Sequence, residues 1–241
     1  MDINYENLPK NLAKALIVEN TFVSSTTIRF VLRDEGNFNF VGGQFVSLVV
    51  PKEGKWLNRA YSIASSPEDK NQIVLYIRIE ELGAAGKYLP SLKVGEYIHY
   101  RKAAGKFLFT SRDASTIQFV CTGTGIAPFY AMLCELKAIH QKFKKLRVLS
   151  GFRNESEILM REEFDGLGFS NLSWDIVLSR PSEKWAGLKG YVTDHLLMDP
   201  DAQHYLCGRE EMINTCKQKF LDANLKKESV FEESYGKAFS G

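Results

Sequence analysis

The sequence predicts two halves of different architecture: an N-terminal antiparallel Greek-key β-barrel, followed by a doubly wound parallel α/β unit. In the first half, short runs rich in β-branched and aromatic residues alternate with turn formers, a pattern typical of barrels and sandwiches. In the second half, strand-like and helix-like stretches alternate, which is typical of a parallel sheet covered by helices. The pattern changes near Arg112-Asp113-Ala114, so we assign the two units to residues 1–112 and 113–241.

The individual elements follow from the same patterns. In the first half the strand candidates are residues 27–32, 44–50 and 73–79, separated by turn formers at residues 42–43, 51–54 and 65–67. In the second half the strand candidates are residues 116–121, 145–152, 174–179 and 203–208. Helices are expected at residues 128–145, 156–164 and 210–224, because apolar residues recur there at helical spacing.

Composition narrows the functional classes. Lysine and arginine total 31 against 29 acidic residues, a balance that argues against a general nucleic-acid binder. The cysteines form no Cys-x-x-Cys pair and the histidines show no metal-ligand spacing, so we expect neither an iron–sulfur cluster nor another metal site. The chain begins without a signal-peptide pattern and has no apolar run near the roughly 20 residues that span a bilayer. We therefore expect a cytoplasmic monomer with reduced thiols and no membrane partner.

A glycine-rich segment follows the first predicted strand of the second half. Gly123, Thr124 and Gly125 precede Pro128, which suits the first turn of a helix because proline lacks the N–H that would be unpaired there. Glycine lets the backbone approach a phosphate, and a helix N-terminus offers free N–H groups to it. The segment matches neither Gly-x-Gly-x-x-Gly nor a Walker loop. A tight strand-to-helix turn without a ligand is the alternative to a nucleotide loop.

The segment Arg59-Ala60-Tyr61-Ser62 resembles the Arg-x-Tyr-Ser signature of the ferredoxin–NADP⁺ reductase-like flavoprotein family. The resemblance implies that the arginine meets the FAD pyrophosphate, that the tyrosine stacks on the isoalloxazine, and that the serine lies near flavin N5. A guanidinium fork suits phosphate oxygens, and an aromatic ring suits a flat ring system. A surface arginine and a packing tyrosine at a barrel end are the alternative.

Further segments extend this resemblance along the first half and to the end of the chain. The family's Gly-x-x-Ser-x-aromatic-Leu loop corresponds to residues 83–89, where a glycine replaces the serine, and its Gly-Pro-aromatic-Gly segment corresponds to residues around Gly105, without the proline. The terminal Glu-x-Tyr corresponds to Glu233-Ser234-Tyr235, after which this chain continues. The implied FAD contacts are Arg59, Ala60, Tyr61, Ser62, Tyr76, Ile77, Arg78, Ala84, Ala85, Gly86, Thr124 and Tyr235.

The second half carries the implied nucleotide site. Cys207, Gly208 and Met212 resemble the family's Cys-Gly-x-x-x-Met motif near the nicotinamide. The implied NAD(P)H contacts are Gly123, Thr124, Gly125, Pro128, Arg153, Ser179, Arg180, Lys189, Tyr191, Cys207, Gly208 and Met212. Cys207 is alternatively a buried small hydrophobe, and Tyr235 is alternatively a C-terminal anchor.

The resemblance implies an enzyme that moves a hydride from NAD(P)H to FAD and then passes electrons to a small acidic carrier, ferredoxin or flavodoxin. Ser62, Cys207 and Glu233 are the implied catalytic residues: the serine orients N5, the cysteine shapes the nicotinamide pocket, and the glutamate helps to move protons. An NAD(P)H:flavin reductase, which reduces free flavin, and the reductase component of an oxygenase are alternatives. A regulatory subunit that binds FAD without turnover is another.

Two groups of cations bear on the partners. Arg153, Arg180 and Lys189 favour NADPH over NADH, because the 2′-phosphate needs cations near the strand ends that receive the ribose, although the segment around Lys189 also resembles NADH-using oxygenase reductases. A basic run straddles the end of a predicted helix, and it is explained either by the helix dipole or by docking of an acidic carrier. It comprises Lys137, His140, Lys142, Lys144, Lys145 and Arg147.

Overall fold

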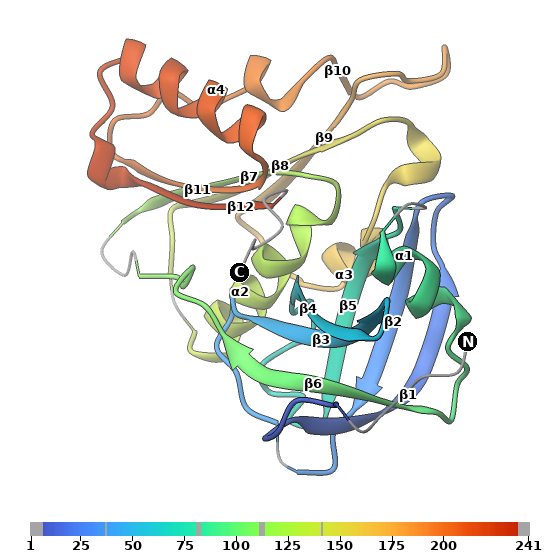
Figure 1. Ribbon diagram of the computed structural model, residues 1–241. Helices are drawn as coiled ribbons and strands as arrows, with labels where there is room; N and C mark the ends of the chain where they lie inside the picture. The colour runs from blue at the N-terminus through green and yellow to red at the C-terminus, as the bar shows by residue number, and fades with distance from the viewer. Residues whose placement is uncertain (1–6, 37, 81–82, 111–113, 141, 236–241) are drawn as a thin grey trace.

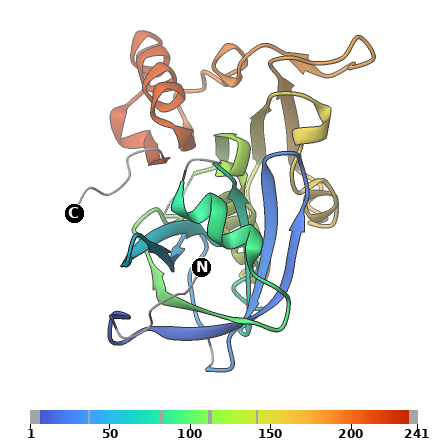
Figure 2. The same ribbon diagram turned by 45° about the vertical axis from the view of Figure 1, so that its right-hand side comes forward.

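The computed structural model describes residues 7–36, 38–80, 83–110, 114–140 and 142–235. These residues form two six-stranded sheets with helices around the second. The antiparallel sheet lies below and the parallel sheet above in the view of Figure 1. The turned view keeps the two layers apart, with the barrel below and the parallel sheet with its helices above (Figure 2). The predicted fold class is confirmed. The predicted change of character at Arg112-Asp113 lies outside the described residues.

The first sheet curls into a barrel in the order β4-β3-β6-β1-β2-β5. Its strands are β1 (Ala13–Phe22), β2 (Thr27–Arg33), β3 (Phe45–Lys52), β4 (Lys55–Ser62), β5 (Gln72–Arg78) and β6 (Tyr97–Ala104). A bridge between Ile63 and Leu75 joins the end of β4 to β5 and draws the curled sheet together. The three predicted strands are found as β2, β3 and β5, whereas β1, β4 and β6 were not predicted. β3 runs on to Lys52, so the predicted turn shrinks to two residues with positive φ angles, Glu53 at 49° and Gly54 at 75°.

The second sheet is parallel throughout, in the order β10-β9-β8-β7-β11-β12. Its strands are β7 (Thr116–Thr122), β8 (Lys145–Phe152), β9 (Leu172–Leu178), β10 (Leu188–Lys189), β11 (Ala202–Arg209) and β12 (Val230–Tyr235). The chain runs outward from β7 through β8 and β9, then crosses to β11 on the other side of β7. The order of the strands therefore reverses at β7. In open α/β sheets, ligands bind beyond the carboxyl ends of the strands at such a reversal.

Helices cover both faces of the parallel sheet. α2 (Ile126–Ala138) and α3 (Arg161–Asp165) belong to the same core cluster as Phe119 and Tyr205 of the sheet, and α4 (Glu210–Asp222) packs on the opposite face against Leu149 and Leu206. A short helix, α1 (Ala84–Tyr88), lies against β3 of the barrel. No helix in the described part of the chain combines the length and the apolar character that crossing a membrane requires.

Two of the predicted helices were too long. The helix expected at residues 128–145 ends at Ala138, and His140 follows in a left-handed conformation with φ 52°, which an α-helix does not tolerate. The helix expected at residues 156–164 is broken. A 3₁₀ turn covers Glu155–Glu157, Met160 has φ 61°, and only Arg161–Asp165 is helical. Leu159 and Met160 are buried by this break, and burial overrides the local helix preference.

The two halves share a core. Val31, Val74 and Tyr76 on the outer face of the barrel belong to the same apolar cluster as α2 and α3. Gly42 lies against α2, where its N–H donates to the Glu135 carboxylate at 2.8 Å. A Cβ at Gly42 would lie 2.8 Å from the carbonyl oxygen of Ala131. The Gly42-Gly43 pair predicted as a turn therefore also permits close approach of the barrel to the helix.

Candidate functional site

Successive side chains of β4 point to opposite faces of the sheet, so the four residues of the Arg-x-Tyr-Ser segment fall into two pairs. Arg59 and Tyr61 lie opposite Leu48 and Val46 of β3, so they share the face that those core residues occupy, while Ala60 and Ser62 point the other way. Burial raises the pKa of the Tyr61 hydroxyl to about 12, with Arg59 lowering it and Glu80 raising it. Tyr61 is therefore a neutral phenol at physiological pH.

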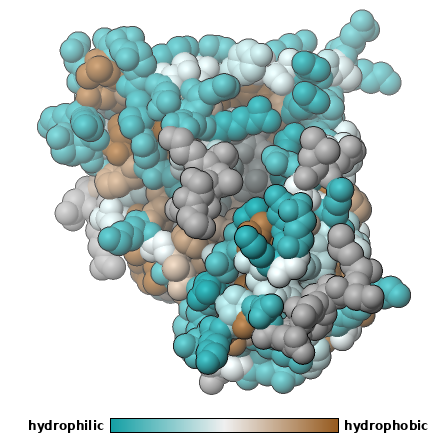
Figure 3. Space-filling model, in the orientation of Figure 1, coloured by the Kyte–Doolittle hydropathy of each residue, from teal (hydrophilic) through white to brown (hydrophobic). Residues whose placement is uncertain are grey.

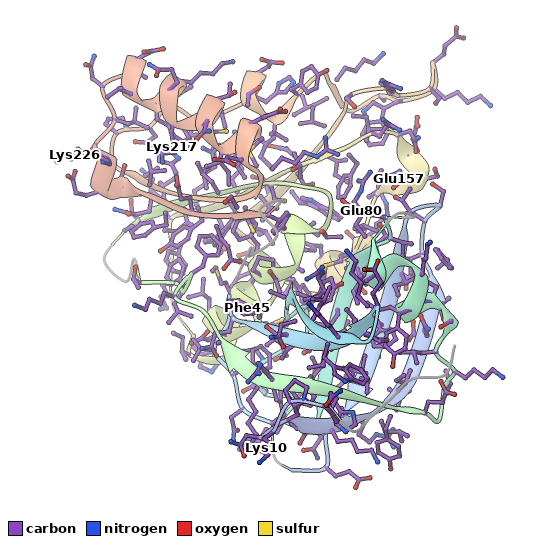
Figure 4. The ribbon with its side chains drawn as sticks, in the orientation of Figure 1. Lys10, Phe45, Glu80, Glu157, Lys217 and Lys226 are labelled. Carbon is purple, nitrogen blue, oxygen red and sulfur yellow. The ribbon has the colours of Figure 1, made fainter. Side chains whose placement is uncertain are left out.

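Arg59 is available to an anion. Its guanidinium donates to the neighbouring carbonyl of Asn58 at 3.0 Å, and among the described residues it makes no ion pair with a carboxylate. Glu80, whose charge acts on Tyr61, immediately precedes the loop that leads into α1 (Figure 4). Arg59 and Glu80 therefore both lie near Tyr61, and Tyr61 packs against the same barrel core as the start of α1. A guanidinium without a carboxylate partner fits a phosphate.

Gly86 has a structural reason to replace the family's serine. A Cβ at this position would lie 1.9 Å from the carbonyl oxygen of Glu80, so no side chain fits. Ala84 and Ala85 begin α1 beside it. Position 86 therefore has no room for a side-chain hydroxyl, and any contact of Gly86 with a ligand is left to its backbone.

The strand predicted to run beside FAD turns two of its three side chains elsewhere. Tyr76 faces the second half of the chain and donates a hydrogen bond to the Glu163 carboxylate, while Ile77 is buried in the barrel core. Arg78, at the end of β5, is exposed. Any contact of Tyr76 or Ile77 with a ligand at β4 is therefore left to the backbone.

The glycine-rich segment lies where the sequence predicted, between a strand and a helix. β7 ends at Thr122, a 3₁₀ turn spans Gly123–Gly125, and α2 begins at Ile126, so Pro128 stands in the first helical turn. The two glycines have different roles. Gly123 has φ 53° and a Cβ there would meet nothing within 4 Å, whereas a Cβ at Gly125 would lie 2.4 Å from the carbonyl oxygen of Cys207. Gly123 therefore faces open space, and Gly125 permits close packing on β11.

The three implied catalytic residues meet where the barrel contacts the parallel sheet. The Ser62 hydroxyl donates to Glu233 Oε2 at 3.5 Å, across a separation of 171 residues in the chain. Cys207 and Glu233 are register partners on β11 and β12. The Cys207 thiol donates to the Tyr235 hydroxyl at 3.4 Å. The tertiary structure thus assembles Ser62, Glu233, Cys207 and Tyr235 at the carboxyl edge of the sheet, beside the Gly123–Gly125 turn.

Burial sets the protonation of this group. It raises the pKa of Glu233 to about 7, although the hydrogen bond from Ser62 acts in the opposite direction. Burial, aided by the Glu233 charge, raises the pKa of the Cys207 thiol well above its ordinary value. Burial, with Cys207 beside it, does the same for the Tyr235 phenol. Only Glu233 therefore titrates near neutral pH, and Cys207 stays a neutral thiol, the form that is not nucleophilic.

Gly208 and Met212 form a packed surface beside Thr122. A Cβ at Gly208 would lie 2.6 Å from Thr122 Oγ1 and 2.8 Å from Met212 Cε. Sequence reasoning missed Thr122. Its position as the last residue of the strand, directly before Gly123, was the available signal, because side chains at that point face the ligand edge of a parallel sheet.

The cations implied for NADPH gather at neighbouring strand ends. The N–H of Arg180 donates to the carbonyl of Arg153 at 2.7 Å, and Lys189 pairs with Leu178 at the end of β9. All these side chains are exposed, Tyr191 at 69%. The group implied by the resemblance, Arg153, Ser179, Arg180, Lys189 and Tyr191, thus follows the ends of β8, β9 and β10.

The basic run lies at the opposite edge of the sheet. Lys145 begins β8, which has 8 residues, so the carboxyl end of that strand is roughly 23 Å away at about 3.3 Å per residue. Arg147 is not part of an exposed basic surface, because its side chain is already paired. Its Nε donates to Asp175 at 2.7 Å and its NH1 to Gln118 at 3.0 Å. The run therefore does not border the assembled site, and because α2 ends at Ala138, the helix dipole accounts for Lys137 but not for the lysines at residues 142–145.

Comparisons with known proteins match each half of the chain to a domain family. Residues 14–109 match the model of the oxidoreductase FAD-binding domain, and residues 119–218 match that of the oxidoreductase NAD-binding domain. The chain is 32% identical over 204 residues to ferredoxin–NADP reductase B of Sorangium cellulosum, covering 79% of this chain and 83% of that protein. It is 29% identical over 222 residues to NADH-cytochrome b5 reductase 1 of Scheffersomyces stipitis, covering 87% of this chain and 78% of that protein.

A solved structure shows the same fold. The ferredoxin NADP⁺ reductase from Neisseria gonorrhoeae with bound FAD and NADP superposes with a TM-score of 0.82 at 20% identity, over 94% of this chain and 99% of that one. The two matched domain models and the relative above 30% identity show that the chain is homologous to these proteins and does not merely share their fold. The chain belongs to the ferredoxin–NADP⁺ reductase-like family of flavoprotein oxidoreductases, which bind FAD and a nicotinamide nucleotide.

Proposed function

We propose that this chain moves a hydride from NADPH to FAD and passes the electrons to an acidic one- or two-electron carrier, ferredoxin or flavodoxin. FAD would be held by residues 1–112 and the nucleotide by residues 113–241. The contact between Ser62 and Glu233 carries the proposal, because it joins the flavin signature on the barrel to the nucleotide edge of the parallel sheet. FAD, when bound, supplies the chemistry of accepting a hydride and releasing electrons.

The binding roles follow from the chemistry of the side chains. Arg59 would pair with the diphosphate, since its guanidinium has no carboxylate partner among the described residues. The neutral ring of Tyr61 would cover one face of the isoalloxazine. The open backbone at Gly123 and Thr124 would receive the nucleotide at the start of α2. Tyr235 would cover the opposite flavin face, as its hydroxyl already lies over Gly125.

Glu233 would control the direction of the Ser62 hydroxyl. When Glu233 is ionised, Ser62 donates its hydrogen to Oε2, as in the observed contact. When Glu233 is protonated, its own hydrogen can go to Ser62 Oγ, which leaves the serine hydrogen free for an acceptor in the cleft. A pKa of about 7 makes both states accessible at neutral pH. Cys207, held as a neutral thiol, would shape the nicotinamide pocket without forming a covalent bond.

We expect the purified protein to be yellow and to release FAD on denaturation, with FMN absent. Arg59→Ala should weaken FAD binding about ten- to hundredfold, because one charge-assisted bond to phosphate is lost. Chromatography of the released flavin and titration of FAD into the stripped protein measure both. Arg101→Ala is the matched control, because Arg101 bonds the same residue, Asn58, through Oδ1 at 3.1 Å on the other face of β4. FMN as the sole product, or equal losses in the two variants, would contradict the assignment.

We expect NADPH to be preferred over NADH, with Arg180→Ala raising KM for NADPH about ten- to hundredfold and leaving NADH unaffected. Arg180 is exposed beside Arg153 at the ends of β9 and β8, where a 2′-phosphate would meet both guanidinium groups. Steady-state kcat/KM for both nucleotides measures the effect, with Arg33→Ala on the barrel as control. Equal use of NADH and NADPH by the unmodified protein would overturn the preference. Parallel loss of both in the variant would remove Arg180 from phosphate recognition.

Tyr235→Ala should strengthen the charge-transfer band of the NADP⁺ complex severalfold, because the ring whose hydroxyl lies against Gly125 no longer competes with the nicotinamide. Tyr235→Phe keeps the ring and loses only the bond from Cys207, so it should change the band far less. Absorption spectra during NADP⁺ titration make the comparison. An unchanged band in the alanine variant would remove Tyr235 from the site. The chain beyond it, residues 236–241, lies outside the described residues.

The electron acceptor is tested separately. The Sorangium relative is named for ferredoxin and NADP, and the Scheffersomyces relative for cytochrome b5 and NADH. An NAD(P)H:flavin reductase and the reductase component of an oxygenase remain the alternatives. Reduction of cytochrome c by NADPH, measured with added ferredoxin, flavodoxin or free FMN, separates these choices. We expect ferredoxin or flavodoxin to accelerate it, whereas acceleration by FMN alone would identify a flavin reductase.

A further inference from the structure

Glu157 joins the two halves of the molecule through a single carboxylate. The tip of the β1–β2 hairpin, which we call the hairpin tip (residues 24–26), carries three hydroxyls in succession. Ser24 and Thr26 donate to Glu157 Oε2 at 3.1 and 2.8 Å, and Ser25 donates to Oε1 at 2.6 Å. Glu157 lies beside the upper end of the β1–β2 hairpin in Figure 4. The hairpin tip thus closes on the segment that follows β8.

That segment, residues 153–157, is tied on its other side as well. The Glu155 carboxylate accepts bonds from the N–H and the hydroxyl of Ser182 at 2.9 and 2.6 Å. The Arg180 N–H donates to the Arg153 carbonyl at 2.7 Å. Asn154 caps the 3₁₀ turn between them by accepting the N–H of Ser156 at 3.1 Å. The segment therefore connects the loop after β9 to the barrel hairpin.

The charge of Glu157 suits this role. Partial burial would raise its pKa, but the three hydroxyl bonds and the nearby Arg78 outweigh burial and hold the pKa below its ordinary value. The carboxylate is ionised at neutral pH, so the three bonds to it are charge-assisted. An open cavity of about 630 Å³ lies beside the contact, lined by Val23 of the hairpin and by Ile158, the residue that follows the segment. Because few side chains pack on that side, the hydrogen bonds to Glu157 contribute more of the interaction between the hairpin tip and the segment.

We infer that Glu157 is a positioning residue for the nucleotide: it fixes segment 153–157 against the barrel, so that Arg153 and Arg180 are held where the adenosine phosphate binds. This inference rests on the proposed function, because it assumes that the nucleotide occupies the ends of β8 and β9. Glu157 itself is not expected to contact the nucleotide. Its effect passes through the segment, by restricting the positions that the two arginines adopt before binding.

The first test is Glu157→Ala, with Glu162→Ala as matched control. Glu162 is an exposed glutamate of α3 that lines the cavity beside the contact, and among the described residues no bond from it to the hairpin is found. We expect Glu157→Ala to raise KM for NADPH and the calorimetric Kd of NADP⁺ about three- to tenfold. We expect kcat to change less than twofold and FAD content to stay constant. Glu157→Gln, which keeps one acceptor oxygen, should restore part of the affinity.

The second test changes the barrel side. A variant with Ser24→Ala, Ser25→Ala and Thr26→Val keeps the carboxylate and removes its donors. If Glu157 acts through the hairpin tip, this variant should raise the Kd of NADP⁺ as Glu157→Ala does, and combining the two should add nothing further. Unchanged Kd in Glu157→Ala, additive effects in the combination, or loss of kcat and FAD together with affinity would each overturn the inference. Failure of the unmodified protein to oxidise NADPH or NADH would instead overturn the proposed function.

Discussion

Replacing Gly125 with alanine is expected to lower kcat/KM for NADPH by about a hundredfold or more while FAD stays bound. The added Cβ would lie 2.4 Å from the carbonyl oxygen of Cys207 and 2.5 Å from the Tyr235 hydroxyl. The Cys207 carbonyl belongs to the backbone of β11. Because β11 is paired with β7 on one side and β12 on the other, it cannot move away from the added Cβ. The Gly123–Gly125 turn must move instead, and displacement of reacting groups by about 1 Å costs on the order of 10²-fold in rate.

A second glycine separates this effect from a general penalty. Gly54 has φ 75° in the β3–β4 turn, and a Cβ there would meet nothing within 4 Å. Gly54→Ala should cost only about 1 kcal/mol of stability through its backbone conformation and leave the kinetics unchanged. Kinetics, flavin content and urea unfolding of both variants make the comparison. A Gly125→Ala protein with unaltered kcat/KM would show that the turn does not place the nucleotide.

Replacing Glu233 with glutamine is expected to hold kcat near its low-pH value, about tenfold above the unmodified protein at pH 8, because the amide N–H can donate to Ser62 Oγ as the protonated carboxyl does. In the unmodified protein, kcat with NADPH should fall as pH rises through about 7, because the protonated carboxyl is the form that leaves the Ser62 hydrogen free. The glutamine variant should lose this pH dependence, since an amide does not titrate in that range. Ser62→Ala should lower kcat and also lose the inflection, because Glu233 acts on kcat through the Ser62 hydroxyl.

Stability should also fall with rising pH because of Glu233. The folded pKa of about 7 exceeds the ordinary value of 4.5, so between these values the folded protein holds a proton that the unfolded chain has released. Stability therefore falls as pH rises from 4.5 to 7, by up to about 3 kcal/mol in total. Glu233→Gln removes this cost, so its Tm should exceed that of the unmodified protein at pH 8 and match it at pH 4. Equal Tm values at pH 8, or an unchanged kcat profile, would contradict the assignment.

Local patterns sufficed for much of the fold. Alternation of apolar residues located β2, β3 and β5, and continuous apolar runs located β7, β8, β9 and β11. β4 and β12 were not predicted, because they carry site residues. A strand of partly exposed, functional side chains lacks the regular alternation of apolar and polar residues that identifies a strand. The broken helix before α3 escaped for a related reason. Its apolar residues satisfy helical spacing, yet Met160 takes a left-handed conformation and is buried in a cluster that includes residues of the barrel.

The sequence by itself determined the fold class, the family and the kinds of side chain at the site, because each depends on residue types a few positions apart. The tertiary structure decided which of these side chains contact one another. Ser62 contacts Glu233 across 171 residues, and the hairpin tip contacts Glu157 across more than 130. The same packing set the pKa of Glu233 near 7 and directed Tyr76 away from β4 toward Glu163. Burial and register depend on distant segments of the chain, so the titration and orientation of these groups exist only once both halves have folded together.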